Sequence, residues 1–338
     1  MRVLVTGGSG FIGSHLIDEL NGAGHKVLNM DRNQPFAQTA SEFVELDIRD
    51  GEDVAQCIRS WRPDVIAHLA AETHVDRSID RPEAFLTTNI LGTYNLLSTA
   101  RDLSVGNPHN APRFIHVSTD EVFGSADGSD AFTEHSPYRP RSPYAASKAS
   151  ADHLVRAWNT TYGLKAVVTN TCNNYGPRQH PEKLIPHMIT RALNGLPLPV
   201  YGDGSNVRDW IHVSDHAAGL RRIIESEATE GTYLIGARTE RSNIDLVRSI
   251  CHHLDERRPR SDGSYAELIT FVTDRPGHDK RYAIDPSAME ATFGWSAAVA
   301  FEEGLASTVQ WYLEHEDWTD RLIAEGYSPE RIGQGPAS

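Results

Sequence analysis

A glycine-rich segment close to the N-terminus constrains the fold of this chain more than any other feature. The segment Gly7-Gly-Ser-Gly10-Phe-Ile-Gly13 follows an apolar run, Arg2–Thr6, and opens an amphipathic run, Phe11–Gly22. Glycines at this spacing allow a tight turn, a close approach of backbone to a pyrophosphate, and close packing of a helix on a strand. An ordinary glycine-rich turn is the alternative. The position between a strand and a helix favours the dinucleotide-binding unit that begins a Rossmann sheet.

The rest of the first half alternates short apolar runs with longer amphipathic ones. This alternation predicts an α/β protein with a doubly wound parallel sheet that is covered by helices on both faces. We expect strands at Arg2–Thr6, Lys26–Met30, Phe43–Leu46, Val65–Leu69, Arg113–Ser118 and Lys165–Thr171. We expect helices at Phe11–Gly22, Asp53–Trp61, Pro82–Leu103 and Pro143–Tyr162.

Beyond Asn173 the pattern loosens into Gly/Pro-rich connections, short strands and a second set of helices. These helices are expected at Leu184–Asn194, Ser214–Glu225, Asn243–Leu254 and Phe301–His315. We therefore predict a Rossmann domain at 1–172 to which some later segments return, a smaller C-terminal α/β substrate-binding lobe at 173–330, and a flexible tail at 331–338. Open parallel sheets bind ligands at their carboxyl edge, so the lobe should lie over that edge. The Ser/Gly/Asp/Pro-rich stretch Ser125–Arg141 is expected to be a surface loop near it.

Composition narrows the range of partners. The 338 residues carry a formal net charge of −14, which disfavours a general nucleic-acid surface because phosphate backbones attract Lys and Arg. Three scattered cysteines are too few for a disulfide framework and fit a reducing compartment. The N-terminus turns glycine-rich too early for a signal peptide, and no apolar run reaches the roughly 20 residues of a membrane span. We expect a cytoplasmic protein that binds neither nucleic acid nor a membrane.

An acidic residue at the end of the second expected strand indicates which dinucleotide binds. Asp31 follows Gly13 by about 18 residues, where a carboxylate can accept both ribose hydroxyls of NAD and would repel a 2′-phosphate. The neighbouring Arg32 could accept such a phosphate, so NADP is the alternative. Further cofactor contacts are expected at Phe11, Ile12, Asp47, Ile48, Leu69, Ala70 and Ala71. The sequence favours NAD.

A tyrosine and a lysine lie one helical turn apart at the start of the expected helix Pro143–Tyr162. In Tyr144-Ala-Ala-Ser-Lys148 the spacing places both side chains on one face. A free tyrosine has a pKa of about 10, and a neighbouring Lys and a nicotinamide cation would favour the phenolate and make it a usable base. A surface Tyr and Lys is the alternative. With the glycine segment, the pair resembles the extended, nucleotide-sugar-modifying form of the short-chain dehydrogenase/reductase superfamily and indicates hydride transfer at a carbon that bears a hydroxyl.

Two adjacent carboxylates follow the strand Arg113–Ser118. Thr119 stands where the superfamily's hydroxyl residue bonds the reacting oxygen, and Asp120-Glu121 come directly after it. Carboxylates beside a substrate are costly to hold unless they act, and a pair whose pKa values are pushed apart can supply one acid and one base. An acidic start of a loop is the alternative.

Longer motifs resemble the family of dTDP-glucose 4,6-dehydratases over nearly the whole chain. The matching segments are His74-Val-Asp-Arg-Ser78, Ser118-Thr-Asp-Glu-Val122, Ser142-Pro-Tyr-Ala-Ala-Ser-Lys148, Asn173-Asn-Tyr-Gly-Pro177, Pro181-Glu-Lys-Leu-Ile-Pro186, Arg208-Asp-Trp210 and Asp274-Arg-Pro-Gly-His278. The resemblance implies conversion of dTDP-glucose to dTDP-4-keto-6-deoxyglucose and water. Tyr144 and Lys148 would serve the oxidation of C4 by NAD. Glu121 would then remove the C5 proton, Asp120 would protonate the departing C6 hydroxyl, and the hydride would return to C6.

The same resemblance implies the remaining site residues. It adds Thr73, Thr88 and Asn173 to the cofactor contacts. It implies substrate contacts at Thr73, Asp76, Thr119, Asp120, Asn174, Lys183, Leu184, Pro199, Tyr201, Arg208, Asn243, Arg275 and His278. Arg208 and Lys183 suit a pyrophosphate in an otherwise acidic chain. The histidines show no metal-ligand spacing, so no metal is expected.

Three positions depart from the family's pattern. The stretch Arg32–Ser41 is shorter than the family's segment near the adenosine, Phe123 replaces a tyrosine, and Thr73 replaces a serine but keeps the hydroxyl. Two other functions stay open. One is another NAD-dependent enzyme of NDP-sugars, such as a UDP- or CDP-sugar dehydratase, a 5,6-dehydrating variant, a 4-epimerase or a glucuronate decarboxylase. The other is a non-catalytic dinucleotide sensor. The resemblance also implies a homodimer that pairs through Pro82–Leu103 and Pro143–Tyr162.

Overall fold

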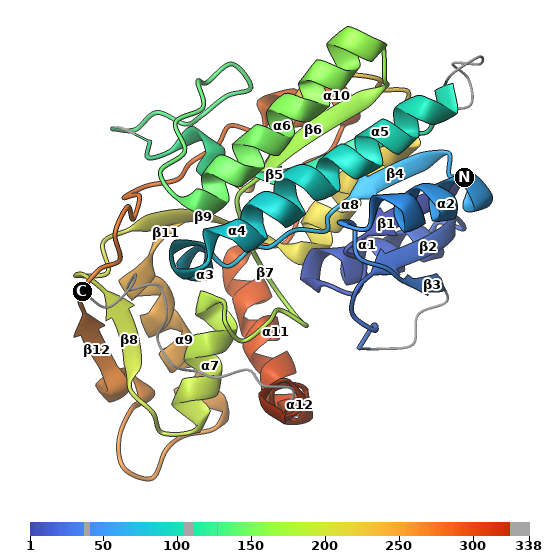
Figure 1. The fold of residues 1–338 in the computed structure, drawn as a ribbon. Coiled ribbons are helices and arrows are strands. Elements are labelled where there is room, and N and C mark those ends of the chain that lie inside the picture. The colour runs from blue at the N-terminus through green and yellow to red at the C-terminus, as the bar shows by residue number, and fades with distance from the viewer. Residues whose placement is uncertain (37–40, 105–110, 127, 325–338) are drawn as a thin grey trace.

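A parallel sheet of seven strands forms the centre of the molecule (Figure 1). The computed structural model describes residues 1–36, 41–104, 111–126 and 128–324. The strands lie in the order β10-β6-β5-β4-β1-β2-β3, and every neighbouring pair is parallel. Their bounds are β1 Arg2–Thr6, β2 Lys26–Asp31, β3 Glu42–Glu45, β4 Val65–His68, β5 Arg113–Thr119, β6 Ala166–Thr171 and β10 Thr232–Ile235. The expected doubly wound sheet is confirmed, and the strand order reverses between β1 and β4, where such sheets bind ligands.

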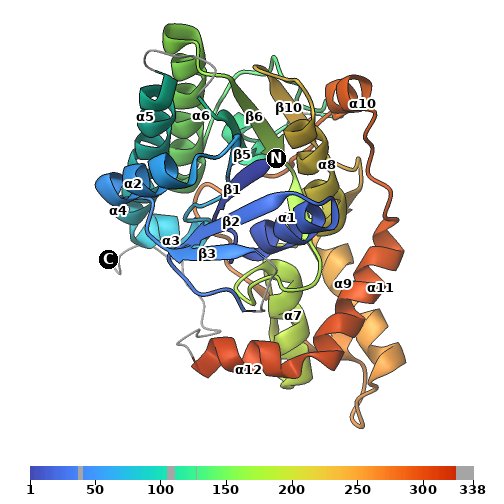
Figure 2. The ribbon, with the colours of Figure 1, turned by 90° about the vertical axis from the view of Figure 1, so that its right-hand side faces the viewer.

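Helices cover both faces of the sheet, as Figure 2 shows. On one side lie α1 Phe11–Gly22 and α8 Val213–Glu225, and on the other lie α2 Gly51–Trp61, α5 Thr93–Ser104 and α6 Pro143–Tyr162. Successive side chains of β1 point to opposite faces of the sheet and pack into two hydrophobic cores. Val3 and Val5 are buried in the core beneath α1, whereas Leu4 is buried in the core with Ile58 and Leu97 on the opposite face. A strand that is buried on both faces reads as the continuous apolar run seen in the sequence.

One long helical stretch differs from the expected regular helix Pro82–Leu103. It begins with α4 Pro82–Phe85, widens into the π-helical segment η1 Leu86–Gly92, and continues as α5. The wide segment presents Asn89, whose side-chain amide bonds both the N–H and the carbonyl of Glu72 beyond β4. A π segment inside an α-helix often marks a functional site, and this one faces the carboxyl edge of the sheet.

The second half of the chain forms a smaller lobe below the sheet in Figure 1. It contains a three-stranded sheet in the order β11-β9-β7 and a two-stranded sheet of β12 and β8. The bounds are β7 Asn173–Tyr175, β8 Leu198–Tyr201, β9 Val207–His212, β11 Glu240–Ser242, β12 Ile269–Val272, α7 Leu184–Leu193, α9 Asn243–Arg257, α11 Phe301–Glu314 and α12 Glu316–Ala324. A core of its own holds the lobe together, including Tyr175, Ile189 and Trp210. Both α8 and β10 return from this half to the main sheet, as expected for some later segments.

The predicted helix and strand boundaries agree with the structure to within three residues. The largest differences are α2, which begins at Gly51, and α9, which extends to Arg257. Three short helices were not predicted: α3 Val75–Asp80, α10 Ser287–Phe293 and α12. They are too short to show a clear apolar periodicity. The predicted tail 331–338 lies outside the described residues.

Candidate active site

The glycine segment forms the turn between β1 and α1. The close approach of other backbone atoms explains why glycines stand there. A Cβ on Gly7, which has φ +72°, would lie 2.6 Å from the N atom of Ala70. A Cβ on Gly13 would lie 2.2 Å from the carbonyl oxygen of Gly7. Gly10 caps α1 without any side-chain hydrogen bond, so Phe11 and Ile12 begin the helix at a backbone surface open to an anion.

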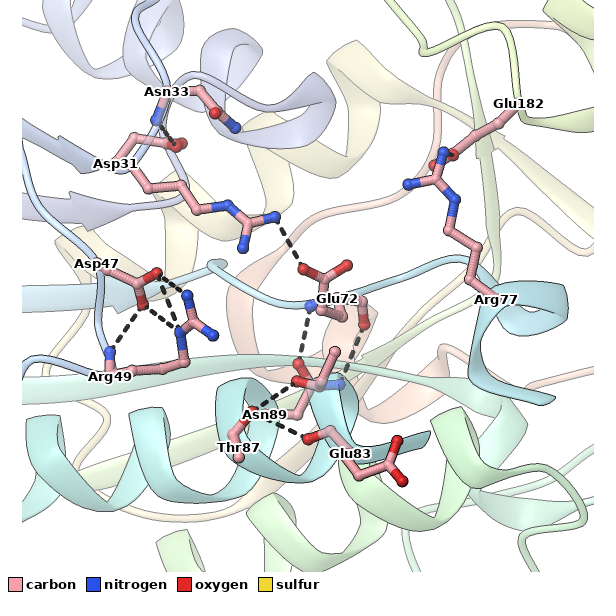
Figure 3. A network of polar contacts seen from close by, with 12 residues as sticks. Asp31, Asn33, Asp47, Arg49, Glu72, Arg77, Glu83, Thr87, Asn89 and Glu182 are labelled. Atoms are coloured by element: carbon pink, nitrogen blue, oxygen red, sulfur yellow. Dashed lines mark hydrogen bonds and ion pairs between the residues drawn. The ribbon is translucent and has the colours of Figure 1, made fainter. Parts of the chain in front are cut away.

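Asp31 ends β2 beside this turn, and its carboxylate is held in place by backbone donors. The N–H of Ser9 donates to Oδ2 at 3.0 Å. The N–H of Asn33 donates to Oδ1 at 2.9 Å, as Figure 3 shows. Burial raises the pKa of Asp31 despite these two hydrogen bonds. Arg32 turns away to Glu72, at 2.8 Å. The cation next to Asp31 is therefore neutralised by another carboxylate, which weakens the case for binding a 2′-phosphate.

The other expected cofactor residues lie along the carboxyl edge of neighbouring strands. Leu69, Ala70 and Ala71 follow β4 directly. Thr88 lies in the π segment η1 and is buried, and its hydroxyl has no hydrogen-bond partner among the described residues. An unpartnered buried hydroxyl is costly unless a ligand bonds it. These residues and the open glycine turn form a cradle that fits a dinucleotide.

Two of the expected cofactor contacts, Asp47 and Ile48, are already engaged within the chain. Asp47 receives the Arg49 guanidinium at 2.6 to 3.0 Å, a pairing drawn in Figure 3. The Ile48 side chain is buried, and its Cδ1 would lie 2.5 Å from a Cβ on Gly92. The structure thus places Asp47 at the edge of the cradle, whereas the Ile48 side chain packs into the core. A contact from Ile48 to the cofactor would have to come from its backbone.

The five expected catalytic residues come together from three elements. Thr119 ends β5, the 3₁₀ helix η3 Asp120–Phe123 follows it, and Tyr144 and Lys148 lie in the first turns of α6. The Thr119 side chain lies next to the Tyr144 hydroxyl, and Lys148 Nζ donates to the Val117 carbonyl at 2.8 Å. Both Tyr144 and Lys148 are buried, with 8% and 4% of their surface exposed. A surface Tyr and Lys, the alternative considered for this motif, is therefore wrong.

The α6 start is positioned by its own sequence. Ser142 caps the helix by accepting the N–H of Ala145 at 3.0 Å, and Pro143 occupies the first helical position. Both features are typical of helix N-termini. The backbone N–H of Tyr144, which no helix carbonyl can accept, donates to the Ser78 hydroxyl of α3 at 3.2 Å. The short helix that the sequence did not reveal thus fixes the backbone of Tyr144.

Burial perturbs the ionisable groups in ways that suit acid–base chemistry. The pKa of Asp120 is well above its usual value because of burial and the adjacent Glu121, and Oδ2 has no partner among the described residues. Burial also raises the pKa of Glu121, but three cations oppose the shift. These cations are Arg275, Arg208 and Lys183. Burial lowers the pKa of Lys148 to about 8 and, together with the Glu121 charge, raises that of Tyr144.

The same three cations line the approach to the acidic pair from the second lobe. Arg275 donates to Asp76 at 2.6 Å, and Lys183 donates to the Thr73 carbonyl at 2.7 Å. Arg208 lies on the Tyr282 ring, 4.1 Å from its centre, and donates to the Asp279 carbonyl. Cations that converge beside carboxylates in a net acidic chain are suited to an anionic ligand such as a diphosphate.

The remaining expected site residues belong to the second lobe. Tyr201 donates from its hydroxyl to Asp76 at 2.8 Å, and His278 bonds Asp274 at 2.6 Å. Asn243 begins α9, and its side-chain oxygen has no partner among the described residues. Leu184 and Pro199 lie at the starts of α7 and within β8, and Asn173 begins β7.

Asn174 differs from the other expected substrate residues because its side chain is used inside the protein. Its oxygen bonds His216 Nδ1 at 2.8 Å, and its nitrogen donates to the carbonyl of Cys172. The sequence analysis did not single out Asp279 and Tyr282, although both support Arg208. The Tyr282 hydroxyl donates to the Asp279 carboxylate at 2.8 Å. Their signal was weak, since they lie just after the motif Asp274–His278 and match no spacing with a known chemistry.

Other features of the described residues lie outside this site. A polar surface hollow of about 650 Å³ between α2 and α5 contains none of the expected site residues. No group of three or more His, Cys, Asp or Glu side chains in the described ranges is arranged to hold a metal ion. Within those ranges, none of the helices combines the length and the apolar character that crossing a membrane requires.

The chain is similar to known proteins over nearly its whole length. Residues 4–308 match the family model described as GDP-mannose 4,6 dehydratase. A dTDP-glucose 4,6-dehydratase of Xanthomonas campestris is 48% identical over 344 residues, which cover 98% of each chain. The crystal structure of a dTDP-glucose 4,6-dehydratase from Streptomyces venezuelae, solved with NAD bound, has a TM-score of 0.86 and 42% identity over 95% of this chain and 100% of that one. The structure of a Thermus thermophilus UDP-glucose 4-epimerase with NAD has a TM-score of 0.84 and 31% identity over 93% of this chain and 100% of that one.

The fold and the buried Tyr-Lys pair define a Rossmann-fold enzyme of the extended short-chain dehydrogenase/reductase class. Within this class, the chain belongs to the nucleotide-sugar 4,6-dehydratase family, to which its dTDP-glucose 4,6-dehydratase relatives also belong.

Proposed function

We propose that the protein is an NAD-dependent dTDP-glucose 4,6-dehydratase that converts dTDP-glucose to dTDP-4-keto-6-deoxyglucose and water. One observation carries this proposal. Asp120 and Glu121 lie beside Tyr144 in one buried site, and the pKa of Asp120 is raised well above that of an ordinary carboxyl. A hydride-transfer site that only epimerises has no use for an additional acid and base. The identity with dTDP-glucose 4,6-dehydratases over nearly the whole chain supports the same assignment.

The chain's own residues would hold NAD in the cradle described above. The turn Gly7–Gly13 would bind the pyrophosphate, Asp31 the ribose, and the unpartnered Thr88 hydroxyl another polar group of the cofactor. When bound there, NAD supplies the hydride acceptor for C4 of the sugar and the hydride donor for C6. Lys148, whose ammonium is buried, would lower the free energy of the Tyr144 phenolate.

Proton transfers are then divided among three side chains. Tyr144 takes the proton of the C4 hydroxyl, which its partner Thr119 helps to orient. The 4-keto group acidifies C5–H, and Glu121 removes that proton because it is the carboxyl surrounded by cations. Asp120, which burial keeps protonated, gives its proton to the C6 hydroxyl, and water leaves. Glu121 returns its proton to C5, and the proton that Tyr144 took replaces the one that Asp120 gave up, so all three side chains are restored. Because the hydride taken from C4 would be returned to C6, the overall reaction involves no net oxidation.

The substrate diphosphate would lie against the cations of the second lobe. Arg208 is held by Tyr282 and Asp279, and Arg275 by Asp76, so both guanidinium groups are fixed before a ligand arrives. Fixed donors lose little entropy when they bind an anion. Asn243, Tyr201 and His278 line the same side, together with Lys183, Leu184 and Pro199, and we assign them to the nucleotide end. We also expect a cytoplasmic location.

We further propose a homodimer that pairs through η1, α5 and α6. Leu91 and Tyr94 are 55% and 46% exposed there, and Tyr162 is 47% exposed. The Tyr94 and Tyr162 rings both touch Trp158, so apolar surface continues from one helix to the other. An exposed apolar patch of this kind typically marks an interface, and a second copy would cover it with the same patch.

A product assay tests the proposed function. Purified protein should convert dTDP-glucose to a product that gives the alkali-induced absorbance of a 4-keto-6-deoxy sugar. Epimerisation of C4 without water loss would favour the alternative suggested by the similar UDP-glucose 4-epimerase fold. Turnover of UDP- or CDP-glucose but not of dTDP-glucose would contradict the thymidine assignment.

A further inference from the structure

A second buried carboxylate lies behind the catalytic centre. Asp152 follows Lys148 by one turn of α6, so the two side chains lie on the same face of the helix. Its side chain is fully buried, with 0% of its surface exposed. A buried carboxylate is costly unless it is paired and hydrogen-bonded, so its surroundings require an explanation.

Two hydrogen-bond donors and an imidazole surround the Asp152 carboxylate. The Tyr138 hydroxyl donates to Oδ2 at 2.7 Å, and Asn170 Nδ2 of β6 lies 3.2 Å from the same oxygen. His116 Nε2 of β5 lies 3.2 Å from Oδ1. Although burial alone would raise its pKa, the donors and the Lys148 charge outweigh burial and lower the pKa of Asp152. The carboxylate is therefore ionised in the folded protein.

The same network reaches the backbone that carries the catalytic residues. Asn170 Nδ2 also donates to the Thr119 carbonyl at 3.0 Å, at the end of β5. Lys148 donates to the Val117 carbonyl two residues earlier. Asp152 is thus linked to both halves of the catalytic centre, through Asn170 to β5 and along α6 to Lys148.

Among the residues that the structure describes, Asp152 is the anion whose charge opposes the effect of burial on Lys148. Burial lowers the pKa of Lys148 to about 8, and the Asp152 charge limits that fall. The imidazoles nearby cannot replace it, because burial and Lys148 hold the pKa of His116 at about 4, and burial holds that of His68 well below its usual value. The titratable or charged groups around Lys148 and Asp152 are His68 on β4, His116 on β5, Tyr138 before α6, Tyr144 and Arg156 on α6, and Glu121 on η3.

We propose that Asp152 is a positioning residue for the reaction, a buried carboxylate that keeps the Lys148 ammonium charged and, through Asn170, fixes the end of β5. The inference rests on the proposed function, in which charged Lys148 supports the Tyr144 phenolate. Removing the Asp152 charge should lower the pKa of Lys148 below about 8. The reaction needs the charged form of Lys148. As the pH is raised, a protein without the Asp152 charge should therefore lose activity at a lower pH than wild type does.

The test is the pH profile of kcat for Asp152→Asn, which keeps the shape and removes the charge. We expect the alkaline limb to move to lower pH by about one unit or more, and kcat at pH 8 to fall by about 10-fold or more, with KM for the sugar nucleotide little changed. Asp215→Asn is the matched control. Asp215 is also buried, but it accepts the N–H groups of Ala298 and Val299 in a purely structural role. The Asp215→Asn variant should have a lower Tm than wild type, and the alkaline limb of its pH profile should stay in place.

A folded Asp152→Asn protein with the wild-type alkaline limb would overturn the proposal, as would an equal shift in Asp215→Asn. If Asp152→Asn does not fold, Asp152→Glu carries the test because it keeps the carboxylate. Its alkaline limb should match wild type even if its kcat is lower, and a shift as large as one unit would again overturn the proposal. Absence of dTDP-glucose turnover in the wild-type protein would instead contradict the proposed function, and the two failures are therefore distinguishable.

Discussion

Adjacent carboxylates can have different chemistry when their surroundings differ, and Asp120 and Glu121 are an example at the scale of single residues. Asp120 is buried and Glu121 is half-buried, and their removal from water raises both pKa values. The positive charges of Arg275 and Arg208 oppose the rise in the pKa of Glu121 most strongly. Asp120 lies next to the Glu121 carboxylate and near Asp209, and both raise its pKa further. Burial with unlike neighbours pushes the two pKa values apart, which suits one acid and one base.

Asp120→Asn tests this division. We expect water loss to slow by about 100-fold or more, because the amide cannot protonate the leaving hydroxyl. Oxidation of C4 should be affected far less, so the absorbance of reduced cofactor should accumulate when substrate is added. Tyr144→Phe is the comparison, and it should suppress both steps. An unchanged overall rate in Asp120→Asn would show that Asp120 is not the acid.

Among the elements, the sequence predicted the strands and helices with strong patterns and missed those without them. The β1–α1 unit was predictable because its glycines lie close together in the sequence. The Tyr144-Lys148 pair was predictable because its four-residue spacing places both side chains on one face of a helix. The π segment η1 and the short helix α3 were not, because tertiary bonds of Asn89 and Ser78 fix them. The position of Arg208 on Tyr282 depends likewise on chain segments about 74 residues apart, which no local pattern can reveal.

Gly13→Ala tests the role of the first turn. The added Cβ would lie 2.2 Å from the Gly7 carbonyl oxygen, so the backbone of the turn must shift. We expect stability to fall by about 1–3 kcal/mol and NAD to be largely lost during purification. Gly22→Ala is the control, since its Cβ would meet nothing within 4 Å at the end of the same helix. Normal NAD content in Gly13→Ala, measured by absorbance after denaturation, would contradict this account.

For the whole molecule, the charged site and the exposed apolar patch lie on different parts of the fold. The catalytic groups lie at the carboxyl edge of the sheet beneath the second lobe, whereas Leu91, Tyr94 and Tyr162 lie on the outer side of the helices α5 and α6 and of η1. Because α6 carries Lys148 on its inner face and Tyr162 near its end, pairing through this layer would also stabilise the helix that carries the catalytic pair.

Leu91→Asp tests the pairing. A charge in the centre of a buried apolar interface should shift the protein from a dimer to the 37.4 kDa monomer in sedimentation analysis. Phe271→Asp is a matched control because Phe271 is 58% exposed on β12, in the other lobe. That variant should sediment like wild type. A monomeric wild-type protein, or a Leu91→Asp variant that stays dimeric, would show that this patch is not the interface.

The central claim is that one site moves hydrogen from C4 to C6 while water is lost between C5 and C6. The most direct measurement uses dTDP-glucose labelled with deuterium at C4 and follows the label by NMR. We predict that the deuterium appears in the C6 methyl group of the 4-keto-6-deoxy product. A product that retains the label at C4 with the C6 hydroxyl intact, or a label lost to solvent, would contradict the claim.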